Sequence, residues 1–332
     1  MLSKLHQKIQ DQKIKLLCLD LDGTLLFNRH LLSRKNHVAC IAAQKEGIEI
    51  ILSTGRDLQG ALPVARNILI NKNQGYVVSL NGAKIYDIRK REVIYSNLIP
   101  EKLMKEAIQY LQSNGWKFLV YTTSGSYSNI SSWIAKIVAS QINEKIAKTS
   151  DMKKFQNSCY KIIAIYTKGF IKKKELKTKT KELVEKFSGK LEVAPTHNLS
   201  IEITNLNVNK GEAVKWLAAK KDILMEEVAA IGDGWNDLPL LKVSGVSIAM
   251  GNAITELKKV AKFTTGTNKE SGVADAINKY VLTEKIEFSD TKEFEGITQK
   301  KKKLNVKKTE KKVIKKDKKN LKQITQKKSK KT

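Results

Sequence analysis

Residues 14–24 of the chain read Ile14-Lys15-Leu16-Leu17-Cys18-Leu19-Asp20-Leu21-Asp22-Gly23-Thr24. The first half of this stretch is short and apolar, as expected for a β-strand that is buried on both faces of a parallel sheet. Its second half places two carboxylates, Asp20 and Asp22, directly after that strand, and Gly23 permits a turn there. We therefore predict an α/β fold that carries its chemistry at the carboxyl end of this strand.

On the carboxyl side of this stretch, helix and strand signals alternate. Ser33 can cap a helix that Gly47 ends. The apolar positions that recur at helical spacing in it are Val38, Ile41 and Ala42. Apolar runs at residues 48–52 and 76–80 predict two further strands, with another helix between them. This β-α-β-α-β order predicts a Rossmann-like, doubly wound parallel sheet with helices on both faces.

The middle of the chain follows a different pattern, and we predict an α+β segment inserted into the first fold. Pro100-Glu101 can open a helix that closes near Gly115. Further helices are expected at residues 130–146 and 172–187, and strands at 118–123, 160–166, 191–193 and 199–204. The earlier pattern then resumes, with Asn209 as a helix cap and Glu212 at the third helical position. The expected domains are a core of residues 14–82 and 205–283, an inserted cap of residues 83–204 and a tail of residues 284–332.

Four polar clusters fall where a predicted strand ends or a helix begins. They are Asp20/Asp22, Ser53/Thr54, Lys210 and Asp233/Asn236/Asp237. The carboxyl ends of parallel strands share one edge of the sheet, so these distant positions should meet there. Carboxylates in one cleft repel each other unless a cation neutralises them, and oxygen ligands with few His or Cys favour Mg²⁺. A divalent cation beside a lysine suits a phosphate, for which Thr54, backbone N–H groups and the helix start at Asn209 would add donors.

Two aspartates spaced by one residue suit phosphoryl transfer in two steps. A carboxylate such as Asp20 can act as a nucleophile and form an aspartyl phosphate. A second carboxyl group, Asp22, can protonate the leaving oxygen and later accept a proton from water. A phosphomutase would use the same site but return the phosphoryl group to a sugar, and the exclusion of water decides between the two reactions. Both reactions remain open on this pattern.

Several segments resemble the motifs of one family, the haloacid dehalogenase (HAD) superfamily of phosphohydrolases. Its four motifs match, in order, residues 20–25 (Asp-Leu-Asp-Gly-Thr-Leu), 53–56 (Ser-Thr-Gly-Arg), 209–211 (Asn-Lys-Gly) and 232–237 (Gly-Asp-Gly-Trp-Asn-Asp). Residues 79–83, 249–253 and 271–277 resemble further segments of the Cof-type branch, which carries a large α/β cap between the second and third motifs. The predicted insertion occupies that place, and the likeness covers about residues 14 to 283. The pair Leu240-Leu241 departs from the pattern, because a methionine is common there.

The resemblance implies a Mg²⁺-dependent phosphatase that acts on small phosphate monoesters such as sugar phosphates. It implies Asp20 as the nucleophile and Asp22 as the general acid and base. The side chains of Asp20 and Asp233 and the carbonyl of Asp22 would hold Mg²⁺, with Asp237 supporting the metal shell.

The same resemblance implies which residues hold the substrate. The phosphate would be held by Thr54, Gly55, Lys210 and Asn236. Arg56 and Asn81 would face the cap, where the substrate is selected. His197, just before the last strand of the insertion, is a further candidate for a substrate contact, whereas we expect Trp235 to serve packing.

The charge of the chain is concentrated at one end. The 332-residue sequence has a formal net charge of +29, and residues 300–332 contain 17 lysines against two acidic residues. A block of like charges stays disordered and attracts polyanions. No aromatic residue follows Phe294, so the segment could contact a nucleic acid only through its phosphates. Two interpretations remain open: a solvated tail without a partner, and non-specific contact with nucleic acid or an acidic surface.

The remaining composition predicts a cytoplasmic protein. Cys18, Cys40 and Cys159 lie far apart and indicate neither a disulfide framework nor a zinc site. The first residues lack the apolar segment of a signal peptide. No run approaches the ~18 apolar residues of a membrane helix, so we expect no membrane contact.

Overall fold

The computed structural model describes residues 13–28, 31–70, 72, 74–130, 146–148, 158–166, 173–195 and 200–287. For residues 146–148, 173–176 and 195 it describes the backbone alone. Most of the helix expected at 130–146, the candidate His197 and the lysine-rich segment lie outside the described residues.

An eight-stranded sheet forms the first layer, in the order β16-β15-β14-β1-β4-β5-β6-β7. The strands are β1 (Leu16–Leu19), β4 (Glu49–Ser53), β5 (Gly75–Ser79), β6 (Lys84–Asp87), β7 (Glu92–Ser96), β14 (Val228–Gly232), β15 (Val246–Ala249) and β16 (Phe263–Thr264). The six from β16 to β5 run parallel, and β6 and β7 add an antiparallel edge. Strands β1 and β14 are buried along their whole length, which explains why they are continuous apolar runs. The predicted doubly wound α/β core is confirmed.

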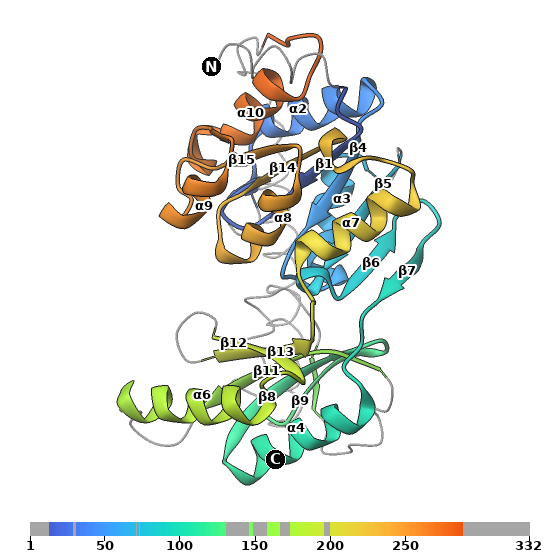
Figure 1. Ribbon diagram of the computed structural model, residues 1–332. Coiled ribbons are helices and arrows are strands. Elements are labelled where there is room, and N and C mark those ends of the chain that lie inside the picture. Colours follow the sequence, from blue (N-terminus) through green and yellow to red (C-terminus); the bar gives the residue numbers. More distant parts are fainter. Residues whose placement is uncertain are drawn as a thin grey trace, which may run out of the picture. The chain divides into compact units, whose positions relative to one another are not determined.

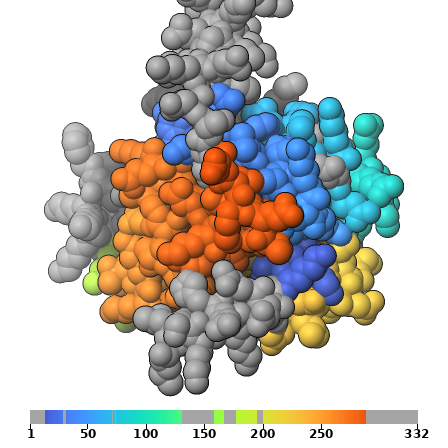
Figure 2. Space-filling view, turned by 90° about the horizontal axis from the view of Figure 1, so that it is seen from above, coloured from blue at the N-terminus to red at the C-terminus, as the bar shows by residue number. Residues whose placement is uncertain are grey.

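Helices flank this sheet, and distant parts of the sequence meet on it (Figure 1). They are α2 (Arg34–Lys45), α3 (Leu58–Asn67), α7 (Lys210–Lys220), α8 (Leu238–Val243), α9 (Thr255–Val260) and α10 (Gly272–Tyr280). Helix α2 packs against α10, and α7 packs against α8. Figure 2 shows the last part of this domain, in orange, beside the N-terminal segments in blue. A small hairpin of β2 (Leu26–Asn28) and β3 (Leu31–Leu32) follows β1.

A second sheet of six strands lies in the inserted segment, in the order β10-β9-β8-β11-β13-β12. Its strands are β8 (Trp116–Thr122), β9 (Gly125–Ser128), β10 (Ile146–Lys148), β11 (Cys159–Tyr166), β12 (Leu191–Pro195) and β13 (Ser200–Asn205). Helices α4 (Glu101–Ser113) and α6 (Lys173–Phe187) contribute Ile108, Leu183 and Phe187 to a core against one face of this sheet. Leu119 and Tyr121 on the other face pack with residues that follow β5, among them Leu80. This second face therefore looks toward the first domain.

The start of the insertion differs from the expected residue 83. Strands β6 and β7, up to Ser96, pair with the first sheet, and helix α4 opens the second layer at Glu101. A parallel sheet accepts an antiparallel hairpin at its edge, and a hairpin needs no helical crossover. Sheet membership therefore moves the boundary from residue 83 to the segment between Ser96 and Glu101. In the part of the chain that the structure describes, no helix is long and apolar enough to cross a membrane.

Candidate active site

The candidate catalytic loops converge because their strands are parallel neighbours. Asp20 follows β1, and its backbone N–H still donates to the carbonyl of Ile231 in β14 at 3.1 Å. Asp233 follows β14 directly, and Thr54 follows β4 on the other side of β1. The backbone N–H of Thr54 donates to Val78 of β5 at 2.8 Å. The carboxyl ends of four adjacent strands thus meet at one edge of the sheet.

Lys210 enters this edge from the first residue of helix α7. The side chain of Asn209 caps that helix by accepting the backbone N–H of Glu212 at 2.9 Å. Lys210 is fully buried, and its Nζ donates to one oxygen of Asp20 and one of Asp237, each at 2.6 Å. Burial alone would lower the pKa of Lys210, but the two carboxylates outweigh it and the pKa is raised. The ammonium is therefore a permanent charge in this cleft.

Three carboxylates surround that single ammonium. One oxygen each of Asp20, Asp233 and Asp237 lies within 4.8 Å of the others. Burial is the largest effect on Asp20 and raises its pKa, and the nearby charges of Asp237 and Asp233 raise it further against the opposing charge of Lys210. Burial likewise raises the pKa of Asp233. Three ionised carboxylates and one ammonium leave two negative charges, which a hard divalent cation would neutralise.

Asp237 differs from the other two because both of its oxygens already have partners. One accepts from Lys210, and the other accepts the backbone N–H groups of Asp233 at 3.0 Å and Gly234 at 2.9 Å. Only 1% of its side chain is exposed. Asp237 therefore shapes the loop after β14 and holds Lys210.

The carboxylate of Asp233 is fixed by neighbours from other segments. The hydroxyl of Thr24 donates to its Oδ1 at 2.8 Å, and Asn252 Nδ2 lies 3.4 Å from its Oδ2. Gly23 has a φ of +88°, and a Cβ at this position would lie 2.3 Å from Asp233 Oδ2. Only a glycine allows the two motifs to approach this closely.

Asp22 and Arg56 form an ion pair at the mouth of the cleft. Arg56 donates to both oxygens of Asp22, at 2.7 and 2.5 Å. The side chain of Asp22 is 48% exposed, whereas that of Arg56 is 13% exposed. Asp22 therefore stays accessible to a substrate while Arg56 fixes its orientation. In this structure Arg56 contacts an expected catalytic group, whereas a contact with substrate was expected.

The loops expected to hold phosphate are joined to one another. Thr54 Oγ1 accepts the backbone N–H of Arg56 at 3.1 Å. Asn236 Nδ2 donates to Asn81 Oδ1 at 3.0 Å. A Cβ on Gly55 would lie 3.0 Å from the same Asn81 oxygen, so the glycine makes room for that side chain. Thr54, Gly55, Asn236 and Asn81 therefore form one connected rim.

Some residues of this region make contacts that the sequence alone did not predict. Thr24 and Asn252 lie in the motifs at residues 20–25 and 249–253, but their contacts with Asp233 were not predicted. Lys161 and Glu202 come from the inserted segment and contact Gly55 and Asn81. The only indication in the sequence is that each is a charged residue flanked by apolar residues within a strand. Trp235 is 62% exposed, so the expectation that it serves packing is wrong.

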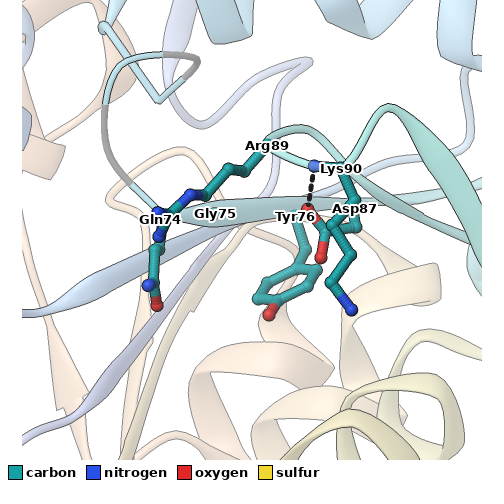
Figure 3. Close-up of a pocket in the computed structure, with 6 residues that line it drawn as sticks. All are labelled: Gln74, Gly75, Tyr76, Asp87, Arg89 and Lys90. Atoms are coloured by element: carbon teal, nitrogen blue, oxygen red, sulfur yellow. Dashed lines mark hydrogen bonds between the residues drawn. The ribbon is translucent and has the colours of Figure 1, made fainter.

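A cavity of about 170 Å³ lies at the opposite end of β5 (Figure 3). Its lining includes Gly75, the first residue of that strand, and Asp87, which accepts the backbone N–H of Lys90 at 2.9 Å. The expected catalytic residues follow the carboxyl ends of the strands, whereas this cavity opens at an amino end. It is therefore separate from the candidate site.

Comparison with known proteins gives the family. A model of haloacid dehalogenase-like hydrolases matches residues 17–277. A 5-amino-6-(5-phospho-D-ribitylamino)uracil phosphatase from Bacillus subtilis is 29% identical over 278 residues, which cover 82% of this chain and 98% of that protein. A second Bacillus subtilis phosphatase, YwpJ, is 29% identical over 286 residues, covering 79% of this chain and 98% of its own. The crystal structure of a haloacid dehalogenase-like hydrolase from Bacteroides thetaiotaomicron is 30% identical and superimposes with a TM-score of 0.72, covering 80% of this chain and 98% of that one. The chain belongs to the haloacid dehalogenase-like hydrolase family, in its Cof-type phosphatase branch.

Proposed function

We propose that this protein is a Mg²⁺-dependent phosphatase that hydrolyses small phosphate monoesters through an aspartyl phosphate on Asp20. The observation that carries the proposal is the buried cluster of Asp20, Asp233 and Asp237 around Lys210. With all three carboxylates ionised, the cluster carries two uncompensated negative charges, which favour a divalent cation. The lysine supplies a fixed positive charge for a phosphate oxygen.

The donor set of the cluster fits Mg²⁺, because it offers carboxylate oxygens and no His or Cys. Asp20 and Asp233, with the carbonyl of Asp22, would hold the ion, and Asp237 would support them through the loop after β14. When bound, Mg²⁺ neutralises charge on the cluster and on the phosphate oxygens. Lys210 opposes the negative charge of the cluster through its 2.6 Å contact with Asp20 Oδ1.

In the first step, Asp20 attacks the phosphorus atom and forms a new P–O bond. The bond between phosphorus and the ester oxygen breaks, and Asp22 donates its proton to that leaving oxygen. The exposed position of Asp22 at the mouth suits contact with the leaving group. Arg56 contacts both oxygens of Asp22, so one of these contacts must be released for that oxygen to carry the proton, while the other keeps the group oriented. Thr54, Gly55 and Asn236 would hold the phosphoryl oxygens during this transfer.

In the second step, a water molecule attacks the phosphorus of the aspartyl phosphate. Asp22, now ionised, accepts a proton from that water, and the P–O bond to Asp20 breaks. Inorganic phosphate leaves, and the carboxylate of Asp20 is regenerated. Both steps use the same pair of carboxyl groups, with Asp22 alternating between acid and base.

The substrate class is small phosphorylated metabolites. Support comes from the Bacillus subtilis relative, which is named for a small phosphate ester and matches this chain over 98% of its own length. The named substrate belongs to that protein, and 29% identity leaves room for a different leaving group here.

A phosphate-release screen tests this function. The full chain is incubated with a panel of phosphorylated metabolites, in Mg²⁺ and in excess chelator. We expect steady release of inorganic phosphate that the chelator abolishes and Mg²⁺ restores. Activity that persists in chelator would refute the metal dependence. Turnover that requires a bisphosphate and returns the phosphoryl group to a sugar would identify a phosphomutase instead.

A further inference from the structure

Two charged residues of the inserted segment reach the rim of the candidate site. Lys161 of β11 donates to the backbone carbonyl of Gly55 at 3.2 Å and to Glu202 Oε1 at 3.0 Å. Glu202 of β13 accepts the amide of Asn81 at 3.0 Å through its other oxygen. Both core contacts are residues expected to hold phosphate or substrate.

A β-bulge in β11 brings Tyr160 to the face that Lys161 already shares with Ile163, the face toward the first domain. The pairing of β11 with β8 shifts between Cys159 and Lys161, so Tyr160 is an extra residue. Cys159 and Ile162 both pack in the core beneath helices α4 and α6. Tyr160 and Lys161, between them, therefore turn together to the opposite face. Bulges occur often beside active sites, where they redirect a side chain.

Both bulge residues make contacts with the first domain. The hydroxyl of Tyr160 lies 2.9 Å from that of Ser96 in β7, and its ring lies 5.1 Å from Lys84 Nζ. Lys161 lies 5.1 Å from the ring centre of Tyr121, and 2% of its side chain is exposed. Burying an ammonium is costly, and an ion pair with a well-placed carboxylate offsets that cost. A contact made at such cost beside the cleft indicates a role beyond stability.

The contact with Gly55 acts on one peptide group. The carbonyl of Gly55 and the N–H of Arg56 belong to the same planar peptide unit. Lys161 binds the carbonyl end, and the N–H end donates to Thr54 Oγ1 at 3.1 Å. A fixed peptide leaves the hydroxyl hydrogen of Thr54 free to point at a phosphate oxygen.

The contact of Glu202 acts on the other side of the rim. Glu202 holds the amide nitrogen of Asn81, and Asn81 presents its oxygen to Asn236 at 3.0 Å. One cap-borne ion pair thus fixes Thr54 through Gly55 and Asn236 through Asn81.

We propose that Lys161 and Glu202 are a positioning pair that holds the phosphate-binding rim in its working geometry from the inserted segment. The inference rests on the proposed phosphatase function, and neither residue touches the reacting atoms. The rim then binds phosphate fully only where the second sheet packs against it.

Two variants and one matched control test the pair. Lys161→Met keeps the length of the side chain without its charge, and Glu202→Gln keeps the shape of the carboxylate. Lys179→Met is the control, because Lys179 forms a 2.7 Å ion pair with Glu182 on helix α6 of the same segment. The probes are p-nitrophenyl phosphate as substrate and inorganic phosphate as competitive inhibitor.

We expect Lys161→Met and Glu202→Gln each to raise KM and the inhibition constant for inorganic phosphate about tenfold. This factor corresponds to the loss of one charge-assisted hydrogen bond. The turnover number should change less than KM, because the rim binds phosphate in ground and transition states alike. The double variant should raise KM and the inhibition constant no further than the more impaired single variant does, because the two residues act as a unit. Lys179→Met should match the wild type.

Unchanged phosphate inhibition in both variants, with the wild type active, would overturn the pair and leave the phosphatase function standing. A lower melting temperature with unchanged KM and inhibition would also overturn it, since that is the result of a structural role alone. Should Lys161→Met not fold, Glu202→Gln decides, because Glu202 is 20% exposed and the substitution is isosteric. A wild type without Mg²⁺-dependent phosphate release would instead remove the proposed function.

Discussion

At the scale of single residues, the chemistry depends on an excess of negative charge in a buried place. Lys210 balances one of the three carboxylates around it, and the pKa of Asp20 is raised because burial and its acidic neighbours disfavour ionisation. A nucleophilic carboxylate must be ionised to attack. The same cluster that lacks a counter-charge therefore needs a cation before Asp20 becomes reactive.

Replacing Asp20 by Asn tests the nucleophile. The amide is nearly isosteric but a poor nucleophile, so we expect the turnover number to fall by about 10⁴ or more. The fold should persist, because the substitution adds no volume and removes one repelling charge. Turnover is measured by phosphate release and folding by circular dichroism. Near-normal Mg²⁺-dependent activity in the variant would show that Asp20 is not the nucleophile.

Replacing Lys210 by Ala tests the buried ammonium. Asp20 and Asp237 would each lose a hydrogen bond of 2.6 Å and stay buried without a counter-charge, which costs about 3–5 kcal/mol of unfolding free energy. Lys215→Ala on the same helix is the control, because that lysine pairs with Glu212 at the surface and should cost less than ~0.5 kcal/mol. Urea unfolding measures both. Equal losses in the two variants would contradict the argument.

The raised pKa values of Asp20 and Asp233 predict how stability depends on pH without metal. In the folded state these groups keep protons that an unfolded Asp releases above about pH 4. Their contribution to stability is therefore complete below that pH and is lost as pH rises through their raised pKa values. We expect the melting temperature in chelator to fall with rising pH, and less so in Mg²⁺ or in Asp20→Asn. A melting temperature in chelator that rises as the pH increases from about 4 through these raised pKa values would contradict the proposed excess of carboxylates over ammonium in the cluster.

At the scale of elements, the sequence predicted helix caps better than helix faces. Ser33 and Asn209 cap α2 and α7 as expected. A side-chain oxygen at this position accepts a backbone N–H of the first turn, which has no partner within the helix. The buried face of α2, in contrast, includes Asn36 and Ala39, while Val38 is exposed. Asn36 donates to the carbonyl of Leu25 and accepts the N–H of Ala274, both at 3.0 Å. An amide that is satisfied in the core by partners from distant segments leaves no hydropathy signal.

The same limit applies to the candidate site. The loops after β1, β4 and β14 could be predicted because strand ends in a parallel sheet meet at one edge. Lys161 could not, because its partners Gly55 and Glu202 are 106 and 41 residues away in the sequence and meet it only in the assembled fold. The hairpin of β6 and β7 was missed for a similar reason, since its pairing partner is an edge that only the assembled sheet provides.

Two glycines test how closely elements approach. Gly47 and Gly82 both have positive φ, at +83° and +107°, so alanine is strained at each by about 1–2 kcal/mol. A Cβ at Gly47 meets nothing within 4 Å, whereas at Gly82 it would lie 2.3 Å from the carbonyl oxygen of Asn209. We expect Gly82→Ala to lose more unfolding free energy than Gly47→Ala in urea. It should also weaken phosphate inhibition, because the clash displaces the start of α7 and hence Lys210. Equal losses would show that the backbone at Asn209 yields easily.

At the scale of the whole molecule, the family resemblance and the lysine-rich segment occupy different parts of the chain. The match to the family model ends at residue 277. The match to the 5-amino-6-(5-phospho-D-ribitylamino)uracil phosphatase covers 98% of that protein but only 82% of this chain. Residues up to Ile286 belong with the first domain, because Asn278 donates to the carbonyl of Ile286 at 3.0 Å and accepts its N–H at 2.9 Å. The 17 lysines beyond residue 299 lie outside the matched part.

Deleting residues 288–332 separates the two parts. We expect kcat/KM for a phosphate ester to change less than about twofold, because every residue of the candidate site is retained. If the segment contacts nucleic acid, the full chain should bind RNA with an affinity that falls about 10³–10⁵-fold between 50 and 200 mM salt, as expected for 6–10 phosphate contacts. The truncated chain should then lose that binding. Equal RNA retention by both chains at low salt would exclude the segment as the binding element. A loss of phosphatase activity on truncation would show that activity requires residues beyond the part that the relatives share.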